Sequence, residues 1–583
     1  MTLAARRTRP RHARLAATAC ILTLAILRVS AATAAVGCGE VDVVAVNTLN
    51  SNPFRWSASD AISPLWGAAT QVGSNWSSIR LVALEDGWNL PSTPSRAAQK
   101  IYAVDNSGAL NEYTFNGTRY EGGQIATGWG DVTHILAAGG GVIYAVRSNG
   151  DLKWYRWLGK DGWEANSGTV IGRGWNGLSS VFGGGNGVIY GVRASNGDLL
   201  WYKHKTPGFP EPRWLGPAVV GNSWGELREL VSGGNGLIYG IDRSQQLVMY
   251  NHLGAQTGQV SWANSGRPTV VGHGWQSYNR LAINSHACPT PIPSRADSVD
   301  RSLYFIHGFA INGLIGKPSA NCGSTGGGGT WGAALGEFRA RGWTGMMKTV
   351  GYYAGDTNCD VTIAGGDLST SISKLARAMA WYLYDHHSQF GEQVDVVAHS
   401  MGGLIARAAI DFTANRVLAD DGGAFPPYLY VEDVATMSTP HLGADFANDC
   451  AFFAQCAQMR RNSDFLKSLA DHNPQSASGT DWTLIASSGD SVTADYSGLA
   501  LVSVLPGYMT PGHLVLYRDY EHTDIDGAVG VCCDDVEYWQ YHGRPRNAGD
   551  TPDDDSIHPG GWDTSGPKPV DWAFDAVSRW SEF

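Results

Sequence analysis

The sequence lacks three features that would point to a membrane, nucleic-acid or zinc-binding protein. Its N-terminal apolar run, Leu15 to Leu27, has only 13 residues, which is too few to span a bilayer. Positive charge is scarce, with 42 Lys and Arg against 53 Asp and Glu, so the chain is a poor candidate for binding nucleic acid or anionic lipid. No two cysteines have the Cys-x-x-Cys spacing that would favour zinc. We therefore expect no metal, no nucleic-acid partner and no integral membrane segment.

The first 34 residues have the pattern of a secretory signal peptide. Five arginines between Arg6 and Arg14 precede the apolar run, and Ala32-Thr33-Ala34 is a suitable cleavage site. The pair Arg6-Arg7 leaves the twin-arginine route open. We expect a secreted protein, whose net charge falls from −11 to −17 when the six arginines of this segment are removed.

The cysteine count fits an exported protein held together by disulfides. Nine cysteines become eight once Cys20 is removed with the signal, and an even number in such a chain favours pairing. We expect three bridges, Cys38–Cys288 around the N-terminal half, Cys322–Cys359 and Cys450–Cys456. Cys532 and Cys533 are left as a strained vicinal bridge or as partners in a different scheme.

The segment from Val394 to Arg407 carries the clearest catalytic signal of the chain. A Val-rich strand runs into Ser400, and an apolar helical pattern follows it directly. Ala398 and Gly402, two residues before and after Ser400, are small, as a tight strand-to-helix turn requires. A helix N-terminus behind the serine favours the negative charge that develops in acyl transfer. This pattern predicts a nucleophile elbow.

Two later strands end in loops that carry a candidate acid and a candidate base. Asp490 follows the strand 482–486, and His522 follows the strand 514–517, in the chain order Ser, acid, His. For the acid, the less well placed alternatives are Asp481 and Asp495. For the base, the alternatives are His513, His542 and His558; His513 precedes its strand, and the other two have no strand before them.

These positions predict a separate catalytic role for each of the three residues. Ser400 attacks an ester carbonyl, His522 moves the proton, and Asp490 holds the imidazole, with no cofactor needed. The backbone N–H groups of Met401 and Phe309 are the expected oxyanion donors, because Phe309 follows an early strand, 303–306, and the dipeptide His307-Gly308.

The Ala-His-Ser-Met-Gly-Gly elbow, His307-Gly308-Phe309 and the run from Ser438 to Gly443 together resemble the secreted bacterial lipases and esterases of the α/β-hydrolase fold. The resemblance covers residues 298–583. It implies a pocket that includes His307, His399 and His441, and a cap within residues 444–471. For His441 a purely turn-shaping role of its loop is equally open. The acidic run Asp553 to Asp555 reads as a solvated loop, with calcium as the alternative.

The N-terminal half is built from repeats. Ile-Tyr strands begin near Ile101, Ile143, Ile189 and Ile238, and Asn-Gly turns follow two of them, as in β-hairpins. Tryptophans recur at about the same spacing, at Trp76, Trp129, Trp175, Trp224 and Trp275. Five units of nearly 50 residues, with four short strands each, are typical of propeller blades.

These repeats resemble the tachylectin-type five-bladed β-propeller, a lectin that binds N-acetylated amino sugars. The resemblance implies glycans as a possible partner, through exposed aromatic rings that stack on sugars. The alternative is that the repeated tryptophans form the core between blades, so no sugar-contact residue is named.

Together the patterns predict an all-β five-bladed propeller at 36–288, a proline-rich linker at 289–297 and an α/β-hydrolase domain, with a mostly parallel sheet, at 298–583. We expect a secreted serine carboxylester hydrolase of lipase type, with a lectin-like propeller for targeting. Rival interpretations are an adhesin with an inactive hydrolase half, or a phospholipase, polyester depolymerase or acyltransferase of the same fold.

Overall fold

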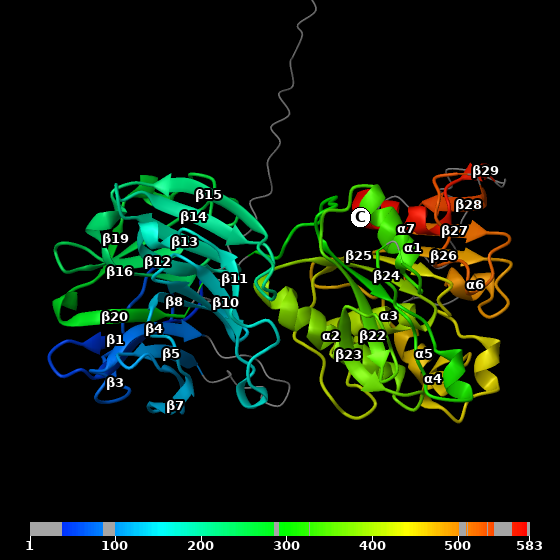
Figure 1. Cartoon of the computed structure of the whole chain (residues 1–583), viewed down its shortest axis with the longest axis horizontal. Coiled ribbons are helices and arrows are strands. Elements are labelled where there is room, and N and C mark those ends of the chain that lie inside the picture. The colour runs from blue at the N-terminus through cyan, green and yellow to red at the C-terminus, as the bar shows by residue number, and fades with distance from the viewer. Residues whose placement is uncertain are drawn as a thin grey trace, which may run out of the picture.

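The computed structural model describes residues 38–85, 99–284, 288, 291–325, 327–500, 509, 511–532, 534–540 and 563–579. The expected signal peptide, Cys533, His542, His558 and the acidic run Asp553 to Asp555 lie outside the described residues. Two bodies lie side by side, a β-propeller and an α/β domain (Figure 1). Within the described residues, no helix is both long and apolar enough to cross a membrane.

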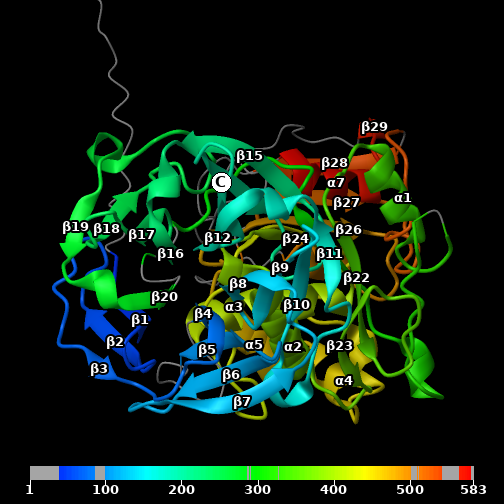
Figure 2. The same cartoon turned by 60° about the vertical axis from the view of Figure 1, so that its left-hand side comes forward.

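The propeller consists of five four-stranded antiparallel sheets, which confirms the predicted fold of this half. Its strands are β1 Val41–Asn47, β2 Pro53–Ala58, β3 Thr70–Gln71, β4 Ile79–Glu85, β5 Lys100–Asp105, β6 Leu110–Phe115, β7 Tyr120–Ala126, β8 Val132–Gly139, β9 Val142–Arg147, β10 Leu152–Arg156, β11 Thr169–Gly172, β12 Leu178–Gly185, β13 Val188–Arg193, β14 Leu199–His204, β15 Trp214–Gly221, β16 Arg228–Gly234, β17 Leu237–Ile241, β18 Leu247–Asn251, β19 Thr269–Gly272 and β20 Tyr278–Ile283. In Figure 2 the innermost strands β4, β8, β12, β16 and β20 surround the axis of the ring. The four Ile-Tyr segments form the second strand of four blades, and β1 takes that place in the fifth.

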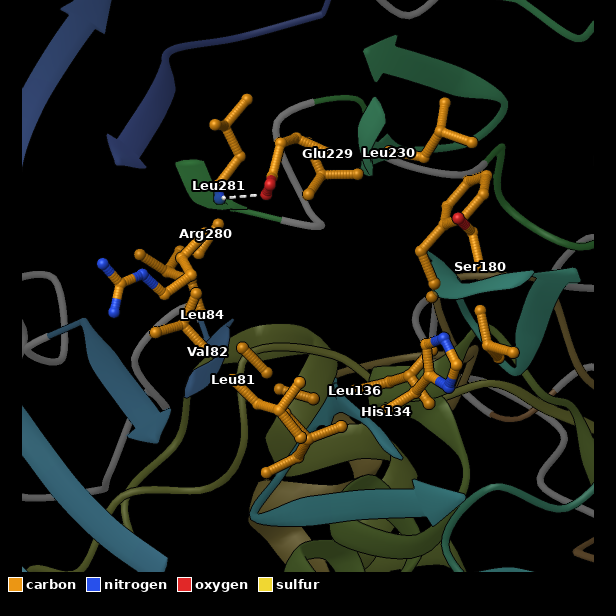
Figure 3. A pocket seen from close by; sticks show the side chains of 18 of the residues that line it. Leu81, Val82, Leu84, His134, Leu136, Ser180, Glu229, Leu230, Arg280 and Leu281 are labelled. Atoms are coloured by element: carbon orange, nitrogen blue, oxygen red, sulfur yellow. Dashed lines mark hydrogen bonds between the residues drawn. The ribbon is translucent and has the colours of Figure 1, made fainter. Parts of the chain in front are cut away.

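The ring closes by combining the two ends of the repeat array in one blade. The last strand, β20, pairs with the first, β1, in the sheet β20-β1-β2-β3. The predicted disulfide Cys38–Cys288 joins the same two ends. Arg280 of β20 donates a hydrogen bond to the carbonyl oxygen of Trp76 at 3.1 Å, just before β4 of the neighbouring blade. A narrow cavity of about 330 Å³ follows the axis and is lined by all five inner strands (Figure 3).

The α/β domain is built on one nine-stranded sheet, in the order β23-β22-β21-β24-β25-β26-β27-β28-β29. Its strands are β21 Ser302–Ile306, β22 Met347–Tyr353, β23 Val361–Gly366, β24 Val394–His399, β25 Val431–Met437, β26 Asp481–Ser487, β27 His513–Tyr517, β28 Asp534–Gln540 and β29 Asp563–Gly566. The strands from β23 to β27 are parallel, and β28 and β29 are antiparallel additions at one edge. The mostly parallel α/β sheet is therefore confirmed.

Helices cover both faces of this sheet. They are α1 Gly332–Ala340, α2 Ile372–His386, α3 Met401–Asn415, α4 Ala454–Met459, α5 Asp464–Ala470, α6 Asp495–Gly498 and α7 Pro569–Arg579. The apolar side chains of α2, α3, α4 and α5 share one core with the sheet, while those of α1 and α7 pack on the opposite face. The central strands are buried on both sides, which explains why they read as Val-rich runs in the sequence.

The segment expected to be a cap is packed into the domain. Cys450 and Cys456 form the predicted disulfide and are buried, as are Met459 and Leu469. These side chains belong to the core on the α3 face of the sheet. Cys322–Cys359 is the third bridge. The Cys532–Cys533 pairing stays a prediction.

Candidate active site

Ser400 lies at the sharp turn between β24 and α3. Its backbone has φ 53° and ψ −128°, a region that residues with a Cβ rarely adopt. The turn also forces close approaches: a Cβ on Gly402 would lie 2.4 Å from the carbonyl oxygen of Ile306, and one on Gly308 would lie 2.7 Å from the Cβ of Ser400. Only glycine fits at either position. The geometry is that of a nucleophile elbow.

Ser400, His522 and Asp490 form one hydrogen-bonded chain. The Oγ of Ser400 is 2.8 Å from Nε2 of His522, and Nδ1 of His522 is 2.8 Å from Oδ2 of Asp490. The three residues follow β24, β27 and β26, so each comes from the carboxyl end of a parallel strand. Since these ends meet at one edge of the sheet, residues about 120 positions apart in the chain converge there.

Asp490 is held in its ionised form. Burial acts to raise the pKa of its carboxyl, but the contacts with His522, with the nearby Ser438 and with the amide of Thr493 outweigh it, so the pKa lies below its ordinary value. The amides of Val492 and Thr493 each donate to Oδ1 at 2.8 Å. A fixed carboxylate can orient His522 and stabilise its imidazolium form.

The alternative acids and bases lie elsewhere. Asp481 and His513 begin β26 and β27, and their side chains contact each other at 3.5 Å at the opposite edge of the sheet. Asp495 begins α6, and its carboxylate accepts a hydrogen bond from the amide of Tyr496. None of these three residues belongs to the hydrogen-bonded series Ser400–His522–Asp490.

The two expected oxyanion donors flank Ser400. Met401 is the first residue of α3, where helix N–H groups have no partner within the helix. Phe309 follows Gly308, whose Cα faces Ser400. This loop is fixed by Tyr352, whose hydroxyl donates to the carbonyl oxygens of His307 at 2.8 Å and Gly308 at 2.6 Å. The backbone beside Ser400 is therefore held in place before any substrate arrives.

A cavity of about 520 Å³ opens beside the serine. Its walls include His307, Phe309, Ile311, His399 and Asp526, together with Ser400 and His522. The ring of His307 stacks on Tyr352 at 4.1 Å, and its Nε2 donates to Asp356 at 3.1 Å.

His441, the third histidine expected in the pocket, is placed elsewhere. It is buried, and its Nε2 contacts the hydroxyl of Thr436 at 3.1 Å. It is not among the residues that line the cavity. Burial and the nearby Arg407 hold its pKa well below the ordinary value. The structure therefore favours the turn-shaping role of this loop over a pocket role for the histidine.

The sequence assigned no role to three residues near the site. Ser438 acts to lower the pKa of Asp490, Asp356 holds His307, and Asp526 contacts His399. Ser438 and Asp356 follow the strands β25 and β22, so the rule that located Asp490 would also have found them. Asp526 lies nine residues beyond the end of β27, and no periodic signal marks it.

The repeated tryptophans of the propeller are structural. All five, Trp76, Trp129, Trp175, Trp224 and Trp275, are buried within the apolar clusters of the blades. Of the two interpretations of the tryptophan pattern, core packing is the one the structure shows.

Comparison with known proteins supports both halves of this description. A family model described as tachylectin matches residues 103–218 and 210–288, and one described as a PGAP1-like alpha/beta domain matches residues 339–504. These matches confirm the two resemblances seen in the sequence. The second contains Ser400 and Asp490 but ends before His522. No curated protein matches the chain significantly.

The solved structures that match parts of this chain are distant from it. A Bacillus licheniformis lipase, BlEst2, is 16% identical over 40% of this chain and 90% of its own, with a TM-score of 0.26. The phospholipase PlaB of Legionella pneumophila is 16% identical over 32% of this chain and 37% of its own, with a TM-score of 0.22. A six-bladed fungal lectin from Aleuria aurantia, described as recognising fucose, is 16% identical over 40% of this chain and 74% of its own, with a TM-score of 0.27.

Proposed function

We propose that the protein is a secreted serine carboxylester hydrolase of lipase type, which works through an acyl-enzyme. The observation that carries this proposal is the hydrogen-bonded chain from Ser400 through His522 to Asp490, with 2.8 Å at each step. A serine at a strained elbow, a histidine in reach and a carboxylate held ionised form the set of groups that acyl transfer needs.

The chemistry follows from the positions of these groups. His522 Nε2 takes the proton of Ser400 Oγ as that oxygen attacks the ester carbonyl. The oxyanion that forms would be bound by the N–H groups of Met401 and Phe309, and the alkoxide leaves with the proton from His522. Water then repeats the sequence on the acyl-enzyme, with His522 again as the base, and releases the acid.

The propeller would hold the enzyme on glycan-rich material, with N-acetylated amino sugars as the class to test first. This part of the proposal rests on the tachylectin match and on the five-bladed ring. The three disulfides support export to an oxidising compartment.

The deciding test compares the mature protein with Ser400→Ala on p-nitrophenyl esters from acetate to palmitate and on emulsified triglyceride. Loss of the nucleophile should lower kcat by roughly four to six powers of ten. Ser369→Ala, at an exposed turn before α2, is the matched control and should behave as wild type. The chain-length profile separates esterase from lipase.

A wild-type protein without activity on any ester would contradict the proposal and favour the adhesin alternative. Binding of the full-length Ser400→Ala protein to immobilised N-acetylglucosamine tests the lectin role independently of catalysis. Hydrolysis of phospholipid or polyester in preference to triglyceride would retain the mechanism and change the substrate.

A further inference from the structure

The residue before the nucleophile is tied to the backbone of the base. His399 ends β24, and its Nε2 donates a hydrogen bond to the carbonyl oxygen of His522 at 2.7 Å. Its other ring nitrogen, Nδ1, lies 3.3 Å from Oδ2 of Asp526, in the loop that carries His522. The three residues therefore make a second connection between the strand of the nucleophile and the loop of the base.

We propose that His399 and Asp526 form a second histidine–carboxyl pair that positions His522 for catalysis, without touching the substrate's reacting atoms. This inference rests on the proposed ester hydrolase function. The first connection, from Ser400 Oγ to His522 Nε2, is the bond that the reaction itself uses. The second connection, through His399, takes no part in the reaction. It stays in place while the proton passes from Ser400 Oγ to His522 Nε2.

The pair needs a proton between its members. Because Nε2 of His399 donates to a carbonyl oxygen, a neutral ring presents a bare lone pair at Nδ1. A carboxylate opposite that lone pair would be repelled, so the 3.3 Å approach requires one shared proton. Burial raises the pKa of Asp526 to about 7 and lowers that of His399 to about 3, so the proton resides on the carboxyl, which donates to Nδ1.

The charged surroundings agree with this assignment. Asp524, on the same loop, also acts to raise the pKa of Asp526, and a contact with its own amide opposes it. His522 and, more weakly, His307 disfavour a positive charge on His399, while Asp490 favours it. Both members of the pair are buried, with 6% of His399 and 7% of Asp526 exposed. None of these groups is a lysine or arginine.

The pair has consequences for the loop 518–527. Without the His399–Asp526 pair, only the hydrogen bond from Nδ1 of His522 to Asp490 and the local backbone of the loop would orient His522. The displacement of a reacting group by about 1 Å can cost roughly a hundredfold in rate. Above the pKa of the pair, loss of the shared proton would turn attraction into repulsion and release the carbonyl of His522.

The test uses the full-length mature protein and a short soluble ester, p-nitrophenyl butyrate. His399→Phe keeps an aromatic ring and removes both nitrogens, and Asp526→Leu keeps the branched shape of the side chain and removes the carboxyl. Each should lower kcat by roughly 10- to 100-fold and change KM by a much smaller factor, because the lost contact orients the base, while the two side chains form only part of the cavity wall. The double variant should be no slower than the slower single variant, because both changes break one connection.

Conservative replacements distinguish positioning from simple packing. Asp526→Asn donates a hydrogen bond to Nδ1 at every pH, so it should recover much of the loss seen in Asp526→Leu. The alkaline decline in kcat that the wild type should show above about pH 7 should be absent in this variant. His399→Gln, whose amide can donate to the carbonyl of His522, should likewise exceed His399→Phe. The proposal is overturned if the effects of His399→Phe and Asp526→Leu add fully, or if Asp526→Asn keeps the wild-type pH profile.

A second readout does not depend on turnover, so it separates failure of this inference from failure of the proposed function. With ¹⁵N-labelled histidine, the signals of His399 are those that vanish in His399→Phe. They should show a protonated Nε2 and a hydrogen-bonded, unprotonated Nδ1, and the Nδ1 signal should move in Asp526→Leu but little in Asp526→Asn. A fully protonated Nδ1, or a signal that does not respond to Asp526→Leu, would contradict the pair even in a protein without esterase activity.

Discussion

Arg156 at the end of propeller strand β10 donates a hydrogen bond to the carbonyl oxygen of Asp385 at 2.9 Å, in the last turn of helix α2 of the other domain. Carbonyl groups in a last helical turn have no partner within the helix, and a cation there is favoured by the helix dipole. The same guanidinium donates to the carbonyl oxygen of Gly140 and to Glu164. A side chain of the propeller thus supplies a hydrogen bond to a carbonyl group in the last turn of a helix in the α/β domain.

Apolar contacts continue this interface. Phe209 of the propeller stacks on His386 at 4.8 Å, and Phe390, just after α2, lies in the apolar cluster of a propeller blade. Figure 1 shows α2 on the side of the hydrolase that faces the propeller. Arg213 of the propeller donates a hydrogen bond to the carbonyl oxygen of Asp300, just before β21, at 3.0 Å. The two domains therefore have the contacts of one folding unit.

Replacement of Arg156 by alanine should uncouple the domains. The side chain is buried, and its removal leaves the carbonyls of Gly140 and Asp385 without this donor, so we expect a loss of about 3 kcal/mol in unfolding free energy. Scanning calorimetry should show one transition for the wild type and two for Arg156→Ala. Arg119→Ala is the control, since Arg119 is exposed and pairs only with an exposed glutamate. Equal profiles for the two variants would count against a coupled interface.

The acid of the catalytic chain can be identified by comparing two aspartates five residues apart. Asp490→Asn keeps the shape but presents a neutral amide to His522, so kcat should fall by roughly four powers of ten. Asp495→Asn changes a carboxylate that bonds a nearby amide at the start of α6, and should stay within about twofold of wild type. Steady-state kinetics on p-nitrophenyl butyrate decides between them, and a larger loss in Asp495→Asn would reverse the assignment.

The sequence predicted the parts of the site that follow from periodicity. The strands before Ser400, Asp490 and His522 are visible as short apolar runs, and parallel strands end at the same edge of a sheet, so their loops converge. The propeller was predictable for a similar reason, because each repeat of nearly 50 residues must form the same unit. Both inferences depend on regular backbone, which local sequence determines well.

The remaining features depend on irregular backbone or on contacts between distant surfaces. Asp526 reaches His399 because the loop 518–527 folds back, and nothing in its composition indicates that path. His441 follows a strand, as catalytic residues do, yet it turns toward Thr436 and not into the cavity. The contact of Arg156 with Asp385 joins residues 229 positions apart across two domains, where no motif could reveal it.

The disulfide Cys450–Cys456 should support the oxyanion loop as well as the fold. Phe446, four residues before Cys450, packs against Phe309 at 5.9 Å between ring centres, and Phe309 is an expected oxyanion donor. Replacing both cysteines by serine should cost about 2 kcal/mol, since the bridge closes a short loop. Hydrolysis of p-nitrophenyl palmitate should fall more than that of the acetate, because a long acyl chain contacts more of this wall. An unchanged ratio of the two rates would show that the bridge only stabilises the fold.

Asp385 should make the stability of the whole protein depend on pH. Burial raises the pKa of its carboxyl from the ordinary 3.8 to about 7, although Arg156 opposes the shift. Between these two values the folded state holds a proton that the unfolded chain has released, so the unfolding free energy falls as pH rises through this window. Asp385→Asn cannot ionise, yet its backbone carbonyl still accepts from Arg156. It should match the wild type at pH 4 and exceed it by about 4 kcal/mol at pH 8. Denaturant unfolding across this range measures the difference, with the fully exposed Asp464→Asn as control. A stabilisation by Asp385→Asn that is equal at both pH values would mean that the carboxyl is already ionised in the acidic range.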